Sequence, residues 1–337
     1  MLQTVRYLIG TVGPSGFGSK TTADDVTESC HDLRSLTAII TGATSGIGAE
    51  VARVLARRGA RLVLPARNLK AAEESRARIA AEFPDSQIFV MALDLSSLSS
   101  VMKFVSEFES LNLPLNILIN NAGKFTHNHT ISDDGIEMTI ATNYLGHFLL
   151  TKLLLNKMVE TAESTGVQGR IVNVTSGIHG WVSGDVIQNL EAITRNKSHY
   201  DATQAYALSK LCNVLHTREL ADRLKEMGAN VTANCVNPGV VRTRLTRERE
   251  GFITDLVFFL ASKLLKTIPQ AAATTCYAAV HPRLLNMSGK YLVDCNEGTP
   301  AKQALSSTEA ARLWAFSDCI VCSEDPKAAW GTCLSSF

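Results

Sequence analysis

The sequence TGATSGIG at residues 41–48 follows a short apolar run and precedes a helical pattern over residues 49–58. Glycines at a strand-to-helix junction let the backbone turn tightly and approach a pyrophosphate. The helix that follows presents unpaired N–H groups and the positive end of its dipole to the same point. A lone glycine-rich turn also occurs as ordinary punctuation, but this context predicts a dinucleotide site. We assign six of its residues to the cofactor: Gly42, Thr44, Ser45, Gly46, Ile47 and Gly48.

Short runs rich in β-branched residues alternate with helix-length segments along the rest of the chain. This alternation predicts right-handed βαβ units and a parallel sheet. We therefore expect an α/β chain with a single-domain Rossmann fold, a doubly wound parallel sheet of about seven strands with helices on both faces. The expected strands are 37–41, 61–64, 87–92, 117–120, 170–175, 230–237 and, after an Ala-rich helix at 270–279, 290–293.

The ends of the chain differ in character from its middle. Residues 1–32 are predicted to be an irregular N-terminal extension, residues 33–317 the Rossmann domain, and residues 318–337 a C-terminal tail without a clear period. Within the domain, residues 242–265 begin with charges and continue as an apolar helix-like segment. We interpret that segment as a substrate lid, either covering a lipophilic substrate or packing against another subunit or the domain's own core.

The composition favours small-molecule partners. The chain has 337 residues and a formal net charge of +1, so no charge excess points to nucleic acid. No transmembrane span is expected, because the most apolar internal run, 256–261, is far shorter than the ~20 residues that cross a bilayer. Residues 1–23 lack acidic residues but contain only two serines and one arginine, a weak match to a transit peptide.

The eight cysteines have neither a repeated close spacing nor an adjacent histidine cluster. No metal site is therefore predicted, and free thiols in a reducing compartment are the expected state. One pair, Cys319 and Cys322, has the C-x-x-C spacing but lies far from any thioredoxin-like unit, so we assign it no redox role.

The second expected strand ends in a basic residue. Roughly 20 residues past the glycines, NAD enzymes place an acidic residue on the ribose hydroxyls, and none is present here. Arg67, followed by Asn68, is instead positioned to meet a 2′-phosphate. The alternative is that Arg67 is a solvated loop cation. This pattern predicts NADP(H) rather than NAD(H) as the cofactor.

From about residue 36 to 316, the chain resembles the short-chain dehydrogenase/reductase family. The likeness is carried by the turn at 41–48, NNAG at 120–123, Asn143, Ser176, YALSK at 206–210 and Pro238-Gly239. NYLGHF at 143–148, SKLCN at 209–213 and AATT at 272–275 are similar to the retinol-dehydrogenase-like branch, which includes WW-domain oxidoreductases. GFGS at 16–19 and TADDVT at 22–27 are similar to its plant Tic32-like members.

The resemblance implies a catalytic set of Asn143, Ser176, Tyr206 and Lys210. Tyr206 and Lys210 are four residues apart and share one helix face; the alternative for such a pair is an amphipathic surface contact. A tyrosine pKa near 10 must fall by ~2 to 3 units to work near neutrality, roughly 3 to 4 kcal/mol, and a neighbouring ammonium supplies much of it. By family precedent Lys210 also binds the nicotinamide ribose, Ser176 holds the substrate oxygen, and Asn143 orders a helix bend and a relay water.

The resemblance also implies the remaining cofactor residues. Asp94 would contact the adenine, or alternatively cap the helix starting near Ser96. Residues of NNAG would line the nucleotide under the adenine ribose, and residues after the sixth strand would edge the nicotinamide. His147 and His179 are expected to be structural or substrate-shaping. The cofactor assignments in these regions are Leu95 beside Asp94; Asn121, Ala122 and Gly123; and Pro238, Gly239 and Thr243.

Two departures from the family pattern weaken a copied substrate assignment. The stretch 177–205 between the serine and the tyrosine is long, although similar to the retinol-dehydrogenase-like branch, and Lys124 stands where an apolar residue is usual. We predict an NADP(H)-dependent oxidoreductase that interconverts a carbonyl and an alcohol on a small lipophilic substrate. The alternative is an NADPH-sensing interaction component at the chloroplast inner envelope with little or no catalysis. The expected location is the cytoplasm or the chloroplast, with peripheral membrane association and homo-oligomers left open.

Overall fold

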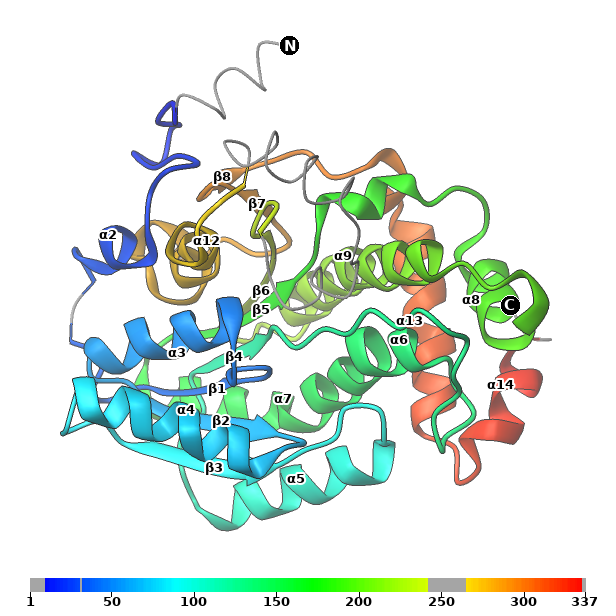
Figure 1. Ribbon diagram of the computed structural model, residues 1–337, viewed down its shortest axis with the longest axis horizontal. Coiled ribbons are helices and arrows are strands. Elements are labelled where there is room, and N and C mark those ends of the chain that lie inside the picture. Colours follow the sequence, from blue (N-terminus) through cyan, green and yellow to red (C-terminus); the bar gives the residue numbers. More distant parts are fainter. Residues whose placement is uncertain (1–9, 31, 242–264, 335–337) are drawn as a thin grey trace, which may run out of the picture.

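The computed structural model describes residues 10–30, 32–241 and 265–334 (Figure 1). Its single eight-stranded sheet has the order β3-β2-β1-β4-β5-β6-β7-β8, in which the first seven strands are parallel. The predicted doubly wound parallel sheet is confirmed. The strands are β1 Thr37–Ile40, β2 Arg61–Ala66, β3 Ile88–Ala92, β4 Ile117–Asn120, β5 Gly169–Val174, β6 Val231–Asn237, β7 Tyr291–Val293 and β8 Asn296–Glu297.

The eighth strand was not predicted, and it pairs antiparallel with β7. Asp294 and Cys295 reverse the chain between them, with φ values of 53° and 62°. Two consecutive non-glycine residues in the left-handed region are unusual, and a two-residue strand leaves no alternating pattern to detect.

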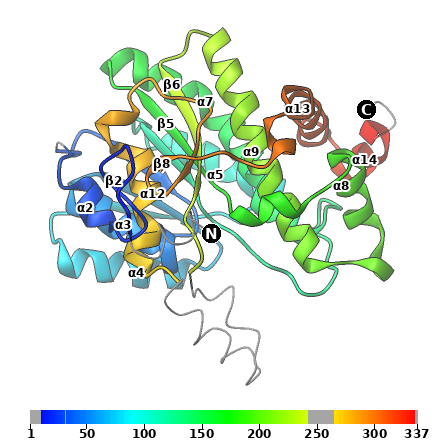
Figure 2. The same cartoon turned by 90° about the horizontal axis from the view of Figure 1, so that it is seen from above.

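Helices cover both faces of the sheet (Figures 1 and 2). One face carries α2, α3, α4 and α12, and the other carries α5, α7 and α9. This arrangement leaves the carboxyl ends of the parallel strands along one edge, where ligands bind in doubly wound folds. The helices are α2 Ala23–Thr27, α3 Gly46–Arg57, α4 Leu69–Glu82, α5 Leu98–Ser110, α6 Met138–Ile140, α7 Gly146–Thr165, α8 Val186–Arg195, α9 Ala202–Glu226, α12 Ile268–Val280, α13 Ser307–Val321 and α14 Pro326–Leu334.

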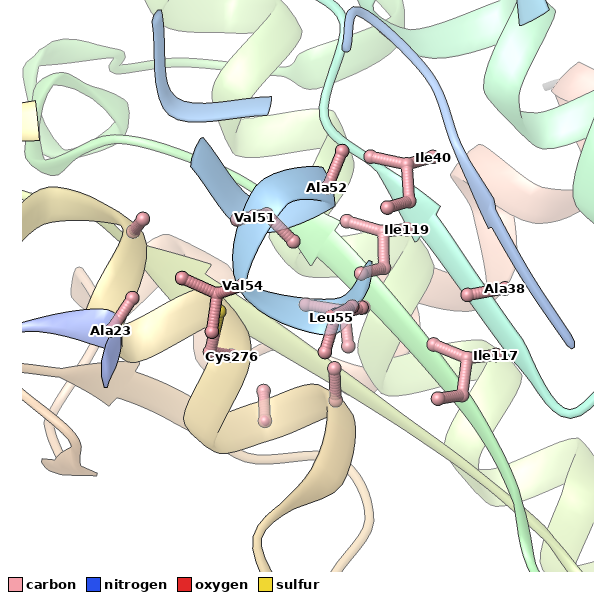
Figure 3. Packing of buried hydrophobic residues seen from close by; sticks show 14 of the residues in the cluster. Ala23, Ala38, Ile40, Val51, Ala52, Val54, Leu55, Ile117, Ile119 and Cys276 are labelled. Atoms are coloured by element: carbon pink, nitrogen blue, oxygen red, sulfur yellow. The ribbon is translucent and has the colours of Figure 1, made fainter. Parts of the chain in front are cut away.

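Helix α3 is fixed by its apolar stripe (Figure 3). Val51, Val54 and Leu55 recur at helical spacing and are 0% exposed. They pack in one cluster with residues of β1 and β4 and with Cys276 of α12. Because α3 is held this firmly, its N-terminus is a rigid platform for the glycine-rich turn that precedes it.

The N-terminal extension is not irregular in the part that the structure describes. Helix α2 begins with a capping box between Thr22 and Asp25, and Ala23 is fully buried against α12. Asp24 forms ion pairs with Arg53 at 2.5 Å and with Arg57 at 2.9 Å. The prediction of an irregular extension is therefore wrong for this segment, since a five-residue helix is too short to show periodicity. The domain boundary at residue 32 stays a prediction.

The C-terminal tail is helical as well. Helix α13 extends past residue 317, and α14 packs beside it through Trp330, whose ring centroid lies 5.2 Å from that of Phe316. A disulfide joins Cys319 to Cys333. The expectation of free thiols is wrong for these two cysteines, because the turn between α13 and α14 brings distant positions together. The described free cysteines are Cys30, Cys212, Cys235, Cys276, Cys295 and Cys322.

The predicted lid falls almost wholly outside the described residues, which omit 242–264 and with them the expected cofactor residue Thr243. Val241 and Lys266, which flank this segment, form an isolated parallel bridge, and the Lys266 N–H donates to the Val240 carbonyl at 2.9 Å. Among the helices the structure describes, none has the length and apolar character needed to span a bilayer.

The burial of His216 in α9 is expected to make the stability of the folded protein depend on pH. Its ring is buried among aromatic side chains, its Nε2 has no hydrogen-bond partner among the described residues, and burial lowers its pKa from 6.5 to about 3. Between pH 6.5 and 3 the unfolded chain thus binds the extra proton, so stability falls as pH falls through that window. We expect acidification from pH 7 to pH 5 to cost wild type about 2 kcal/mol more than it costs His216→Phe, because each pKa unit is about 1.4 kcal/mol.

Urea unfolding at pH 7 and pH 5 measures this difference, with exposed His199→Phe as the matched control. The control should keep the wild-type pH dependence. An equal loss of stability on acidification in wild type and His216→Phe would show that His216 does not titrate as described.

Candidate active site

The glycine-rich turn has no room for a side chain at Gly42 or Gly48. Gly42 has a φ of +68°, and a Cβ on Gly48 would lie 2.4 Å from both the Gly42 carbonyl oxygen and Asn121 Nδ2. Ser45 is the N-cap of α3, and no described side chain makes a capping hydrogen bond there. The first N–H groups of α3 therefore remain available to an anion, as a bound pyrophosphate requires.

Thr41 ties this turn to the NNAG segment. Its hydroxyl oxygen accepts hydrogen bonds from the backbone N–H of Asn121 at 2.9 Å and of Ala122 at 3.0 Å. Asn121 Nδ2 donates to the Thr41 carbonyl at 2.9 Å. His147 Nε2 lies 2.9 Å from the Thr41 hydroxyl, and burial lowers the His147 pKa to about 4. This histidine is therefore neutral near pH 7 and supports the turn from behind.

Asn143 lies between α6 and α7. Residues Ala141–Leu145 form a π-helical turn, an element that is rare in general and frequent at functional sites. Asn143 Oδ1 accepts from the Lys124 N–H at 2.7 Å, and Nδ2 donates to the Lys124 carbonyl at 2.9 Å and to Ser209 Oγ at 3.1 Å. The unexpected Lys124 thus contacts Asn143 through its backbone N–H and carbonyl. These contacts do not depend on the Lys124 side chain, so that side chain need not be apolar.

Tyr206 and Lys210 share one face of α9, as predicted from their spacing. Asp201 caps this helix by accepting from the backbone of Thr203 and Gln204. Lys210 Nζ lies 5.5 Å from the centroid of the Tyr206 ring and donates to the Val174 carbonyl at 3.1 Å. Lys210 is buried and Tyr206 is half-buried; desolvation of these groups raises the pKa of Tyr206 to about 12 and lowers that of Lys210 to about 8.

The two pKa shifts determine the protonation state of each group near pH 7. Tyr206 keeps its proton and is a donor, while most Lys210 side chains remain ammonium ions. Desolvation disfavours the phenolate, so the shift of the Tyr206 pKa is opposite to the lowered tyrosine pKa expected from the sequence. Lys210 donates to the Val174 carbonyl at the end of β5.

Ser176 follows β5 and begins the 3-10 helix Gly177–Trp181. Its carbonyl accepts from His179 Nδ1 at 2.7 Å, and His179 Nε2 accepts from the Ala301 N–H at 3.0 Å. These bonds place the ring proton of His179 on Nδ1. His179 therefore connects Ser176 to the chain after β8 through hydrogen bonds. Among the described residues, the Ser176 hydroxyl makes only a long 3.5 Å contact with the Ile178 N–H, which leaves it available to a substrate.

One large cavity brings most of the expected residues together. It encloses about 1320 Å³ and extends from the glycine-rich turn to Ser176, Tyr206 and Lys210. Asn143 does not line the cavity itself but lies next to Gly123, which does. A Cβ added to Gly123 would be 3.7 Å from Lys210 Nζ and 3.9 Å from Asn143 Oδ1. The expected residues that line the cavity are Gly42, Thr44, Ser45, Gly46, Ile47, Gly48, Asn121, Ala122, Gly123, Ser176, Tyr206, Lys210, Pro238 and Gly239.

Four expected cofactor residues do not line this cavity. Arg67 and Asn68 are exposed just after β2, where Asn68 caps α4 through the Ala71 N–H. Leu95 is buried beside Asp94, whose Oδ1 accepts from the backbone and hydroxyl of Ser96. The alternative of Asp94 as a helix cap is wrong, because Ser97 is the N-cap of α5.

Several cavity residues escaped the sequence analysis. Asn237 precedes Pro238 and accepts from the Gly239 N–H at 3.0 Å, so adjacency to that pair was the available signal. Ser75 and Arg78 reach the cavity from α4, and only their helical spacing could have indicated it. The apolar cavity residues lie in short segments without a detectable period: Phe125, Val240 and Val241 outside helices and strands, and Ile178 and Trp181 in the 3-10 helix Gly177–Trp181.

The chain belongs to the short-chain dehydrogenase family, whose model matches residues 36–252. It is 47% identical over 316 residues to short-chain dehydrogenase TIC 32 B, chloroplastic, from Brassica napus, covering 94% of this chain and 98% of that protein. It is 40% identical to retinol dehydrogenase 12 from Bos taurus, covering 82% and 83% of the two chains. It is 35% identical to the WW domain-containing oxidoreductase of Homo sapiens, covering 90% and 72%. These relatives confirm the resemblance to the retinol-dehydrogenase-like branch and its plant members.

Solved structures agree on the fold. An uncharacterised protein from Mycobacterium Paratuberculosis is 30% identical, with a TM-score of 0.69 over 89% of this chain and 98% of that one. The RhlG/NADP active-site complex of Pseudomonas aeruginosa is 23% identical, with a TM-score of 0.62 over 81% and 98%. The chain is accordingly an oxidoreductase of a family that uses nicotinamide cofactors.

Proposed function

We propose that this protein is an NADP(H)-dependent reductase of lipophilic carbonyl compounds, with Tyr206 as the proton donor. The observation that carries the proposal is the single cavity in which Ser176, Tyr206 and Lys210 meet the glycine-rich turn. The uncapped N-terminus of α3 and the steric demand for glycine at position 48 fit a dinucleotide pyrophosphate. Bound there, the cofactor would supply a hydride from its nicotinamide ring.

Each catalytic side chain then has a separate task. The Ser176 hydroxyl donates to the substrate oxygen and orients the carbonyl, and Tyr206 delivers its proton to that oxygen as negative charge develops on it. Lys210 stabilises the resulting phenolate with its ammonium charge and binds the nicotinamide ribose. Asn143 is a positioning residue, because its three hydrogen bonds hold Lys124 and Ser209 beside this centre.

The remaining cofactor assignments are part of the proposal. Asp94 and Leu95 would contact the adenine, Asn121 and Gly123 the ribose beneath it, and Arg67 with Asn68 the 2′-phosphate. The absence of an acidic residue after β2 and the exposed guanidinium of Arg67 support NADP(H) over NAD(H). Pro238 and Gly239 would edge the nicotinamide.

The apolar wall of the cavity supports a lipophilic substrate. Phe125 packs on the Tyr206 ring at a centroid distance of 5.7 Å, and Trp181 and Val240 at the cavity wall are 75% and 62% exposed. Apolar side chains with few polar groups are typical of sites that bind small hydrophobic molecules. We therefore propose an aldehyde or ketone on an apolar skeleton.

A plastid location is part of the proposal, supported by the likeness to the Brassica protein named chloroplastic. The same likeness motivated the alternative of an NADPH sensor at the inner envelope. A sensor needs the nucleotide turn but not Ser176, Tyr206 and Lys210 around one point. The complete constellation therefore favours catalysis.

The test is oxidation of NADPH by the purified protein with a panel of lipophilic aldehydes and ketones. We expect turnover with NADPH and a kcat/KM at least about tenfold lower with NADH, since a charge-assisted contact to one phosphate contributes that much. Cofactor binding without turnover across the panel would contradict the proposed catalysis.

A further inference from the structure

Helix α4 presents one face to the glycine-rich turn. Ser75, Arg78, Ile79 and Glu82 are spaced at i, i+3, i+4 and i+7, and all four line the cavity. Ser75 Oγ donates to the Ala43 carbonyl at 2.9 Å, so a hydrogen bond links α4 to the glycine-rich turn. Side chains on a helix lean toward its N-terminus, which here lies at the cofactor edge of the sheet.

Arg78 is the cation of this face, which also carries the carboxylate of Glu82. Its Nη2 donates to the Thr44 carbonyl at 3.4 Å, and no carboxylate of the described residues lies within ion-pair distance of it. Arg76, two residues earlier on the same helix, contrasts with it by pairing with Glu73 at 2.6 Å. A guanidinium has five N–H donors, so one long bond to a carbonyl leaves Arg78 most of its binding capacity.

The position of Arg78 suits an anion next to the turn. Because β1 and β2 pair in parallel, their carboxyl ends lie side by side, which brings Arg67 after β2 to the same edge as the turn after β1. Arg78, on α4, reaches the turn through its contact with the Thr44 carbonyl. We propose that Arg78 binds the 2′-phosphate of NADP(H) together with Arg67, so that α4 as well as the end of β2 determines the cofactor preference.

This inference rests on the proposed use of NADP(H), and it differs from a purely structural role. If Arg78 only clamps the turn through Thr44, its loss disturbs the pyrophosphate site and weakens NADPH and NADH alike. If it binds the 2′-phosphate, only NADPH is affected, because NADH lacks that group.

The experiment measures the dissociation constants of NADPH and NADH by fluorescence titration for wild type, Arg78→Gln and Arg76→Gln. Glutamine keeps an amide donor for the Thr44 carbonyl while removing the charge. We expect Arg78→Gln to raise the NADPH Kd about tenfold and leave the NADH Kd unchanged, as loss of one charge-assisted contact predicts. Arg76→Gln should change neither value.

An unchanged NADPH Kd in Arg78→Gln, or an equal rise for both cofactors, would overturn the inference. The readout is binding, so a wild-type protein that binds NADPH without turnover would contradict the proposed catalysis and still test Arg78. A wild-type protein with equal affinity for NADPH and NADH would refute the 2′-phosphate site as a whole.

Discussion

Replacing Tyr206 with phenylalanine is expected to lower kcat by about a thousandfold, the range that general acid catalysis supplies. The substitution removes one hydroxyl from a ring that packs against Phe125 and leaves that packing in place. Without the hydroxyl, the proposed proton donor to the substrate oxygen is gone, and Lys210 donates to the Val174 carbonyl. Stopped-flow or steady-state oxidation of NADPH measures the loss, and the NADPH Kd should stay near the wild-type value.

Tyr200→Phe is the matched control, because it makes the same chemical change a short distance away. The Tyr200 hydroxyl donates to the Thr126 carbonyl or Glu137 Oε1, each at 2.9 Å, and the residue does not line the cavity. Its loss should cost about 1 kcal/mol of stability and little turnover. Turnover in Tyr206→Phe equal to that of the control would remove Tyr206 from the mechanism.

Replacing Gly48 with alanine is expected to raise the NADPH Kd by about a hundredfold. Helix propensity alone would make the substitution favourable for the fold, since alanine stabilises a helix by about 1 kcal/mol relative to glycine. Here the added methyl would lie 2.4 Å from the Gly42 carbonyl and from Asn121 Nδ2, which is itself bonded to Thr41. Relieving such overpacking costs about 1–3 kcal/mol and opens the turn that must cradle the pyrophosphate.

Isothermal titration with NADPH measures this effect, and Gly180→Ala controls for the insertion of a methyl elsewhere. At Gly180 the nearest atom to an added Cβ is Ala301 Cβ at 3.5 Å, an ordinary contact. Wild-type NADPH affinity in Gly48→Ala would mean that the nucleotide does not bind at this turn.

The sequence predicted the sheet because its signals are local. The apolar runs of β1 to β7 and the glycines between β1 and α3 report buried strands and a tight turn directly. Asn143, Ser176, Tyr206 and Lys210 were found through the family resemblance, and the spacing of Tyr206 and Lys210 was sufficient to place both on one face of α9.

The ends of the chain could not be predicted in the same way. Helix α2 is held by Asp24 contacting Arg53 and Arg57, and α14 by a disulfide from Cys333 to Cys319. These are contacts between distant positions, which periodicity does not reveal. Arg78 was also missed as a candidate cofactor residue in the sequence analysis. Its proposed role depends on the packing of α4 against the glycine-rich turn, which is again a contact between distant positions. The upward pKa shift of Tyr206 likewise follows from burial, which residue spacing does not report.

The most direct test of the central claim follows a deuterium label from NADPH into the product. Wild-type protein is given a lipophilic aldehyde of the panel and NADPH stereospecifically deuterated at nicotinamide C4, in two parallel reactions with one diastereomer each. The account predicts that mass spectrometry finds deuterium on the carbinol carbon with one diastereomer and not with the other. Alcohol product without deuterium from either form, or no product while NADPH remains bound, would contradict hydride transfer at this site.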